Sequence, residues 1–561
     1  MYIGKQELFL SDDSVWEYKL MQNFIKPRNS LIQNQNVRKN KNWKQIVSDS
    51  TEQFGQETTI HGLNRLITKA TGRFERSICS LCQYLCSALT VWFVAIFLAL
   101  GILIYVSLII AARYQQKQFQ TVIDTTSCPV YKIPFPELTI CNQNRLNWSR
   151  LDEAKKRFLS KQHQAKDYVS QLFADVLARY DMLTFGKFDR FDNLTTQQLK
   201  TLNYINFTSV VVFMSWRCDE ILANCTWQRK SFNCCEIFFP RKSQYGYCLA
   251  FNSILSPQGL RKQTLDSFWP WRNGADSPGS GLTVKALIKE YNHCPANIND
   301  KGIISMLVEP SVYFDYPISV SANTRTTISI NAIMHFYDDV TRNVPSDIRE
   351  CIFENEQDSP YFTTLAGQKY MYENCQTVCQ QEYLMTLCNC TVDLFYLSGQ
   401  YPSCKLSDLP CLVRYNDRLQ FFEQLGENEF IDTNITGIQC KCYLNCYSLT
   451  YITDVRSVVL KESKRSVNNS FIELDFFYAR NTLMVFKTTL KYTWVDILVS
   501  FGGIIALCLG CSLISFVELL YFLFMDVPSC LWHEGKEAEK LKIKELKIKE
   551  NLNRILHVHK R

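Results

Sequence analysis

Histidine is scarce in this chain of 561 residues, which contains only seven. Three of them, His163, His293 and His335, lie in its central part, without the Ser/His/Asp or metal-type spacing that a catalytic or metal site needs. An excess of one charge is also lacking, since 61 basic residues oppose 54 acidic ones and the net charge is +7. We therefore expect no enzyme, no metal or other cofactor and no nucleic-acid partner.

The chain has no long apolar run before residue 87, which argues against a cleaved signal peptide. Arginine spacing of the voltage-sensor kind is also absent. Apolar runs are present at two later places, residues 87–112 and 497–517, and neither contains a charge. Each can cross a bilayer as a helix of about 20 residues. A buried core helix is the alternative for either run, and more so for the second, which contains three glycines.

Basic residues flank both apolar runs on the side away from the central segment. They are Arg65, Lys69, Arg73 and Arg76 before the first run, and Lys536, Lys540, Lys542 and Lys544 after the second. This pattern predicts that both termini are cytoplasmic. Seven Asn-x-Ser/Thr sequons agree with this, because all lie between the runs, at Asn147, Asn193, Asn206, Asn224, Asn389, Asn434 and Asn468. We expect the segment between the runs to be extracellular and glycosylated.

Cysteines follow the same division, with 18 of the 24 between Cys128 and Cys446. An even number in a glycosylated segment predicts up to nine disulfides. A zinc cluster is the competing interpretation for Cys375, Cys379, Cys388 and Cys390. The oxidising compartment and the absence of nearby histidine favour disulfides.

These patterns divide the chain into five regions of a multi-pass plasma-membrane protein. We expect a cytoplasmic amino-terminal region at 1–86, a transmembrane helix at 87–112, an extracellular cysteine-rich domain at 113–493, a second transmembrane helix at 494–524, and a cytoplasmic tail at 525–561. Residues 1–55 are polar and without sustained periodicity, so we expect a mostly disordered cytoplasmic tail there. Residues 60–86 suit a helix along the membrane.

The extracellular domain is expected to be α+β. Apolar residues at helical spacings predict a helix over 151–183. Alternating or β-branched runs at 312–320, 327–336 and 471–477 predict strands of one sheet, and the last strand should lead directly into the second span.

The tail contains a short repeat, Leu541 to Glu545 followed by Leu546 to Glu550, which predicts a charged helix. A solvated helix and contact with anionic lipid are the two interpretations. Cys79, Cys82 and Cys86 are either palmitoylated beside the membrane or unmodified.

The second span carries a stripe of small residues three or four positions apart, including Ser500, Gly503 and Gly510. Such a face can simply let helices pack closely. In the functional interpretation, the filter residues Gly510, Cys511 and Ser512 interrupt the helix and present carbonyl oxygens to an ion. Glu518 then lies where an acidic side chain could concentrate cations. Two spans cannot enclose a pore, so a channel would need several subunits.

Several segments resemble the degenerin/epithelial sodium channel family, and within it the insect pickpocket subunits. The resemblance runs from about His61 to Tyr521. His61 and Gly62 resemble the cytoplasmic gating motif of the family. Residues 135–142 (FPELTICN) and 245–252 (YGYCLAFN) resemble the paired segments after the first span. Phe501-Gly-Gly503 and Gly510-Cys-Ser512 resemble the pore pattern.

The resemblance implies pairings that spacing alone leaves open. They are Cys141 with Cys248, Cys351 with Cys446, Cys375 with Cys442, Cys379 with Cys440, Cys388 with Cys411, and Cys390 with Cys404. Cys225 is expected to pair with Cys234 or Cys235. The pairing of Cys128, Cys218, Cys294 and the remaining vicinal cysteine stays open.

By resemblance the protein is a homo- or heterotrimer with palm, finger, thumb and β-ball regions, and Na⁺ is the permeant ion. Val499 falls at the degenerin site, and Ala506 falls where relatives often have glycine or serine near the amiloride site; Ser500, Gly502 and Gly503 complete the gating and pore set. The implied function is a pore-forming subunit of an amiloride-type sodium channel that responds to an extracellular ligand, pH or force. A channel gated by ATP and a non-conducting auxiliary or receptor subunit are the alternatives, and the pore pattern argues against the first.

Overall fold

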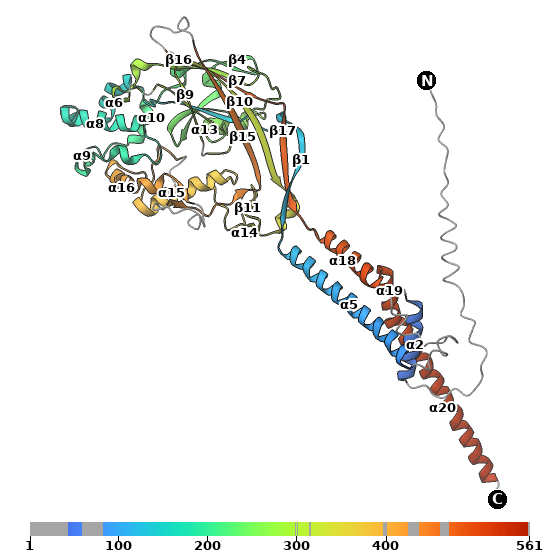
Figure 1. The fold of residues 1–561 in the computed structure, drawn as a ribbon. Coiled ribbons are helices and arrows are strands. Elements are labelled where there is room, and N and C mark those ends of the chain that lie inside the picture. Colours follow the sequence, from blue (N-terminus) through green and yellow to red (C-terminus); the bar gives the residue numbers. More distant parts are fainter. Residues whose placement is uncertain are drawn as a thin grey trace, which may run out of the picture. The chain divides into compact units, whose positions relative to one another are not determined.

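The computed structural model describes residues 43–58, 82–297, 299, 301–313, 316–396, 401–423, 437–460 and 470–558. The chain forms two compact units. One falls within Met1–Gln116 and Tyr492–Arg561, and the other is Lys117–Lys491. The first is helical and the second contains every described strand (Figure 1).

The helices of the first unit come from both ends of the sequence. They are α2 (Trp43–Glu57), α5 (Cys82–Gln115), α18 (Trp494–Leu509), α19 (Leu513–Tyr521), the π-helical turn η10 (Phe522–Asp526) and α20 (Val527–Val558). Two segments are long and apolar enough to cross a membrane, Val91–Gln115 within α5 and Leu513–Lys544, while α18 is a shorter apolar helix. The tail repeat lies in α20, so its predicted helix is confirmed.

Helix α2 corrects one expectation. Residues 43–55 were predicted to lack regular structure, but they are helical, and the ring of Phe54 stacks on Phe522 with 4.5 Å between ring centroids. This contact between distant parts of the chain is invisible to a local pattern. Residues 1–42 lie outside the described part, as do His61, Gly62 and most of the helix expected over 60–86.

The second unit is built on a sheet of eight strands. Strand β10 (Thr324–Tyr337) lies at its centre, antiparallel to β15 and parallel to β16 and β17. The order is β1-β17-β10-β16-β7-β3-β4, with β15 also on β10. The other strands are β1 (Phe119–Pro129), β3 (Leu222–Trp227), β4 (Lys230–Phe232), β7 (Leu282–Ile288), β15 (Tyr447–Val459), β16 (Ser470–Tyr478) and β17 (Thr482–Leu490).

A second sheet has five strands in the order β5-β6-β2-β8-β9. They are β2 (Glu137–Asn142), β5 (Phe238–Ser243), β6 (Gly246–Phe251), β8 (Gly302–Val308) and β9 (Pro317–Ser321). Apolar side chains from both sheets share one core, in which Phe135 and Phe251 are fully buried. Two short pairs complete the strands, β11 (Cys351–Ile352) with β14 (Leu444–Asn445), and β12 (Phe422–Glu423) with β13 (Ile438–Gln439).

Helices of the second unit fall in two groups, before and after β10 in sequence. The earlier ones are α6 (Leu151–Phe158), α7 (Lys161–Gln164), α8 (Asp167–Asp181), α9 (Thr196–Thr201), α10 (Phe207–Met214), α11 (Cys218–Ile221), α12 (Cys234–Ile237) and α13 (Pro257–Leu265). The later ones are α14 (Ser346–Arg349), α15 (Tyr372–Cys388), α16 (Leu409–Arg414) and α17 (Asn416–Leu419). A second apolar core joins α8 and α10 to α15 and α16.

Short 3₁₀ turns link these elements. They are η1 (Val130–Lys132), η2 (Trp148–Arg150), η3 (Phe188–Phe191), η4 (Glu290–Asn292), η5 (Pro295–Asn297), η6 (Asp339–Asn343) and η7 (Leu406–Asp408).

Two further expectations are corrected. The single helix over 151–183 is three helices, because buried Leu159 is extended and Ser160 starts α7 as its N-cap. The strand expected over 312–320 is confined to β9, which belongs to the five-stranded sheet and not to the sheet of β10 and β16. Strands over 327–336 and 471–477 are present in one sheet, as predicted.

Candidate functional site

The helix beginning at Trp494 is interrupted at residues 510–512. Helix α18 ends at Leu509, and its C-cap residue Gly510 has φ +64°, a left-handed conformation that glycine adopts without steric cost. The amide of Gly510 donates to the carbonyl of Ala506, 2.8 Å away. A helix end leaves carbonyls of its last turn without helical donors, and here the Leu509 carbonyl accepts from the Cys511 thiol at 3.7 Å instead.

The chain resumes as α19 through a serine cap. Ser512 is the N-cap, and its hydroxyl accepts from the Ser515 amide at 3.2 Å, while the Ser512 amide donates to the Ser515 hydroxyl at 3.1 Å. This reciprocal pair satisfies two backbone donors at the start of the helix. Ser515 is buried, whereas Ser512 is exposed. The left-handed Gly510 ends one helix and the Ser512 cap begins the next, so the interruption is stabilised on both sides by standard capping interactions.

The expected pore and gating residues lie on the two helices that flank the break. Val499, Ser500, Gly502, Gly503 and Ala506 are on α18, and Glu518 is on α19. Val499 is 67% exposed, Gly502, Gly503 and Ala506 are exposed, and Ser500 and Glu518 are half-buried.

The glycines of α18 do not pack against any other described part of the chain. A Cβ built on Gly502 or Gly503 would meet nothing within 4 Å, although α18 contacts α5. The glycines therefore leave a narrow, open helix face.

Disulfides cross-link the globular unit, and most of them lie in its second half. The structure contains all six pairs that the resemblance implies, Cys141–Cys248, Cys351–Cys446, Cys375–Cys442, Cys379–Cys440, Cys388–Cys411 and Cys390–Cys404. Four of them tie α15 or the residues just after it to the segments 404–411 and 440–442. Each closed loop restricts the unfolded chain, a stabilisation of about 2–4 kcal/mol in typical cases.

Two further bridges answer part of the pairing that the sequence left open. Cys225 bonds Cys234, and the second vicinal cysteine, Cys235, bonds Cys218. Cys128 and Cys294 form no disulfide in the described part of the chain, so eight bridges stand there against an expectation of up to nine. Burial raises the pKa of the Cys294 thiol.

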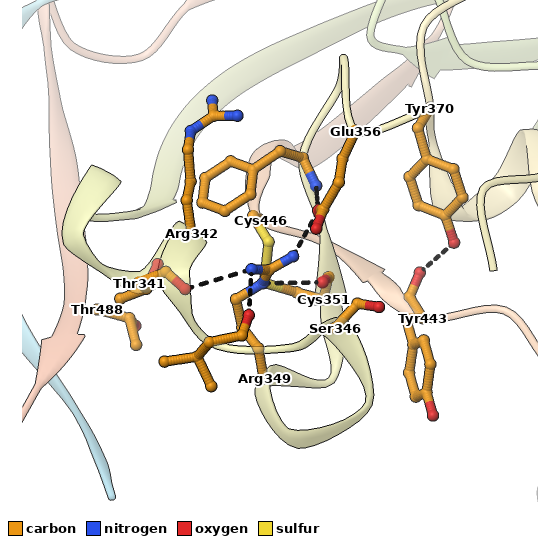
Figure 2. The surroundings of a disulfide bond; sticks show 12 residues. Thr341, Arg342, Ser346, Arg349, Cys351, Glu356, Tyr370, Tyr443, Cys446 and Thr488 are labelled. Atoms are coloured by element: carbon orange, nitrogen blue, oxygen red, sulfur yellow. Dashed lines mark hydrogen bonds and ion pairs between the residues drawn. A yellow bond between two sulfur atoms is a disulfide. The ribbon is translucent and has the colours of Figure 1, made fainter. Parts of the chain in front are cut away.

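Figure 2 shows the surroundings of the Cys351–Cys446 bridge, where Arg349 is fully buried. Its guanidinium donates to the carbonyls of Cys351 at 3.1 Å, Thr341 at 3.2 Å and Val344 at 2.8 Å, and it forms an ion pair with Glu356. Burying a cation is costly unless such partners replace water. The arginine thus holds η6, α14 and β11 around the bridge.

The bridge lies where three long strands are joined. The amide of Tyr337, the last residue of β10, donates to the Cys446 carbonyl at 2.8 Å, and the Asp338 amide donates to the carbonyl of Thr488 on β17 at 2.8 Å. The ammonium of Lys487 lies 3.0 Å from the Asp338 carboxylate, and this partner raises the lysine pKa.

The outer strands of this junction lead to the two apolar helices in sequence. Strand β1 starts four residues after α5 ends, and β17 ends four residues before α18 begins. The amide of Lys491 donates to the carbonyl of Gln118 at 2.9 Å, so the two connections are paired where they leave the sheet.

Sequence reasoning missed Arg349, Thr488 and Lys487. The resemblance pointed to cysteines and to the pore pattern, and a single arginine or threonine has no such signature. The one available signal was the position of Arg349, two residues before a cysteine that the resemblance pairs across about 95 residues.

The described sequons differ in exposure. Asn193, Asn206, Asn224 and Asn389 are exposed. Asn147 is only 3% exposed, its Nδ2 donates to Glu220 at 3.2 Å, and its Oδ1 accepts from Ser149. A glycan would need that nitrogen in solvent, so this geometry does not favour glycosylation at Asn147, which stays a prediction. Asn434 and Asn468 lie outside the described residues.

Comparison with known proteins agrees with this architecture. The family model described as "Amiloride-sensitive sodium channel" matches residues 54–522. Pickpocket protein 19 of Drosophila melanogaster is 29% identical over 77% of this chain and 84% of its own length. Sodium channel protein Nach of Drosophila ananassae is 22% identical over 76% and 80%, and acid-sensing ion channel 1C of Danio rerio is 20% identical over 84% and 82%. The chain belongs to the amiloride-sensitive sodium channel family, also called the degenerin/epithelial sodium channel family.

Proposed function

We propose that this chain is a pore-forming subunit of a sodium-permeable, amiloride-type cation channel that is not gated by voltage. Gly510, Cys511 and Ser512 would form the selectivity filter. The observation that supports this most is the interruption between α18 and α19, where left-handed Gly510 ends one helix and Ser512 caps the next. Non-helical backbone at membrane depth is tolerated where it lines a water-filled path.

One chain cannot enclose a pore, so the channel would be a homo- or heterotrimer of related subunits. The open face at Gly502 and Gly503 supports this, because it is free for neighbouring subunits or for the ion path. Val499, Ser500 and Ala506 would control opening and block on the outer helix, and Glu518 would attract cations further inward. His61 and Gly62 would act in gating from the cytoplasmic side.

The globular unit would be the extracellular receiver of the stimulus, whether ligand, pH or force, at the plasma membrane with both termini in the cytoplasm. In family terms, the sheet of β10 would be the palm, the five-stranded sheet the β-ball, α6–α10 the finger, and the disulfide-rich α15–α16 region the thumb. The Arg349 network and the Cys351–Cys446 bridge support a lever that acts on β17.

Voltage-clamp recording tests the proposal. The subunit is expressed alone and with related subunits, and external sodium is replaced by a large organic cation. We expect a current whose reversal potential moves negative on replacement, and which Gly510→Trp abolishes while the subunit is still present in surface complexes. A reversal potential that ignores sodium would refute sodium selectivity.

A non-conducting auxiliary or receptor subunit is the second candidate, because the same small residues could serve only for packing. In that case Gly510→Trp in a surface-exposed complex would leave the whole-cell current unchanged.

A further inference from the structure

A cavity of about 380 Å³ lies beside the β3–β4 hairpin, a volume within the range of small-molecule sites, roughly 300–1,000 Å³. Its wall comes from β3, β4 and the segment Ser267-Phe-Trp-Pro-Trp271 that follows α13. The aromatic residues of the wall are Trp227, Phe232, Phe268, Trp269 and Trp271. The channel proposal makes no use of these residues.

The wall is held in place before any ligand arrives. Trp271 stacks on Trp227 with 5.8 Å between ring centroids, and its indole N–H donates to Asp266 at 2.9 Å. The amide of the Gln228 side chain donates to the Arg272 carbonyl at 2.9 Å, and Arg272 donates to the Lys132 carbonyl. A preformed site of this kind loses little freedom on binding.

The wall contains a buried N–H donor without an acceptor in the described part of the chain and a large apolar side chain left in solvent. The indole nitrogen of Trp269, a residue only 3% exposed, has no acceptor among the described residues. Phe268 is 82% exposed although it lines the cavity, and nearby Leu265 is 87% exposed. Buried donors are normally paired, and neighbouring exposed apolar side chains mark surfaces that bind something.

The charges around the cavity select the sign of the ligand. Lys230 and Arg272 line it, and none of the described lining residues is acidic. The ammonium of Lys262 lies 4.4 Å from the ring centre of Trp269 and 4.3 Å from that of Trp271, so a cation approaching these rings would meet like charge. The nearby carboxylate of Asp266 already accepts from Trp271 and from the Phe268 amide.

We propose that this cavity binds a small amphipathic organic anion, in which an aromatic or aliphatic body contacts the tryptophan and phenylalanine rings and an acid group lies between Lys230 and Arg272. The position of the cavity in the sheet relates it to the two apolar helices. Strands β3 and β4 form one edge of the sheet whose other edge, β1 and β17, leads in sequence to α5 and α18. A modulation of current by such a ligand rests on the proposed function, whereas binding itself does not.

Binding is tested on the full chain in zwitterionic lipid nanodiscs, with 4-phenylbutyrate as the probe and its neutral amide as the matched compound. Isothermal titration, corrected with empty nanodiscs, should give binding of the acid and at least tenfold weaker binding of the amide. Lys230→Gln should weaken binding of the acid about tenfold, and Phe268→Ala should weaken binding of both the acid and the amide. Lys161→Gln and Tyr168→Ala are controls, because both side chains are exposed and neither lines the cavity.

Equal affinity for acid and amide, or acid binding that Lys230→Gln and Phe268→Ala leave unchanged, would overturn the proposal. So would a loss of subunit association in Phe268→Ala, seen by native mass spectrometry, with unchanged probe affinity, because the surface would then be a subunit contact. Currents are recorded separately. Binding without any wild-type current would leave the site in place and refute the channel proposal for the chain alone.

Discussion

The imidazole Nε2 of His335 lies 2.7 Å from the hydroxyl oxygen of Thr488. That hydroxyl also lies 2.7 Å from the hydroxyl of Thr121, so one buried threonine connects β10, β17 and β1 by side chains. Burial lowers the pKa of His335, which favours the neutral ring in the folded protein at neutral pH.

Thr488→Val should lower the free energy of unfolding by about 1–3 kcal/mol, because it leaves polar atoms of His335 and Thr121 without their shared partner. Guanidinium unfolding of the purified protein measures this. Thr489→Val, on the adjacent half-exposed position, is the matched control and should change stability little. Equal effects of the two variants would contradict the role of the buried hydroxyl.

Glu309 should make stability depend on pH. Burial, together with Glu354 and Glu373 nearby, raises its pKa to about 8. The unfolded carboxyl loses its proton near pH 4.3, so stability from the protonated form declines as pH rises from there to about 8. The melting temperature of Glu309→Gln, minus that of wild type, should therefore increase between pH 5 and 8.5.

Glu382→Gln removes a carboxyl from an exposed position of α15 and serves as the matched control for Glu309→Gln. A flat difference for Glu309→Gln would show that the carboxyl ionises normally in the folded state.

Arg349→Met should destabilise the globular unit by about 3–5 kcal/mol, because Glu356 and three carbonyls lose their buried partner. Arg349→Lys should be less stable than wild type but more stable than Arg349→Met, since an ammonium cannot reproduce the planar guanidinium fork. The melting temperature measures the loss of stability, and surface biotinylation measures how much folded protein reaches the cell surface. Arg456→Met, on an exposed ion pair, should be nearly neutral.

Gly510→Ala should reduce sodium current, because a Cβ in the left-handed conformation costs about 1–2 kcal/mol. Asparagine tolerates that conformation better, so Gly510→Asn should retain more current. Gly101→Ala in α5, where a Cβ meets nothing, should leave the current unchanged. If Gly510→Ala matched Gly101→Ala in current and reversal potential, the left-handed break would not matter for conduction.

Glycan occupancy should follow exposure. Gln substitution at Asn193, Asn206, Asn224 or Asn389 should each remove one glycan mass, whereas Asn147→Gln should remove none. Mass spectrometry of the surface protein before and after glycosidase treatment measures this. A glycan found on Asn147 would mean that its buried hydrogen bonds form only in a different state.

Features that depend on residues adjacent in the sequence could be predicted from the sequence. An uncharged run of about 20 residues must avoid water, which predicted α5, and the Gly510-Cys511-Ser512 segment in an apolar span, where glycine permits unwinding, indicated the break at 510–512. The cysteine pairing came from resemblance and not from spacing, since many connectivities satisfy the same spacing. The helix over 151–183 was wrong because its periodicity continues through Leu159, which tertiary burial holds extended.

The sequence by itself determined the two apolar segments, the oxidised character of the middle of the chain and the position of the helix break, because each follows from residues that are neighbours along the chain. Only the tertiary structure decided that Thr488 connects three strands, that Arg349 is buried beside Cys351–Cys446, and that aromatic rings between residues 227 and 271 line one cavity. The Thr121–Thr488 contact, the Cys351–Cys446 bridge and the ring cluster join residues tens to hundreds of positions apart, which leaves no periodic trace in the sequence. The hydrogen bonds of Arg349 are local, but its burial depends on that long-range bridge.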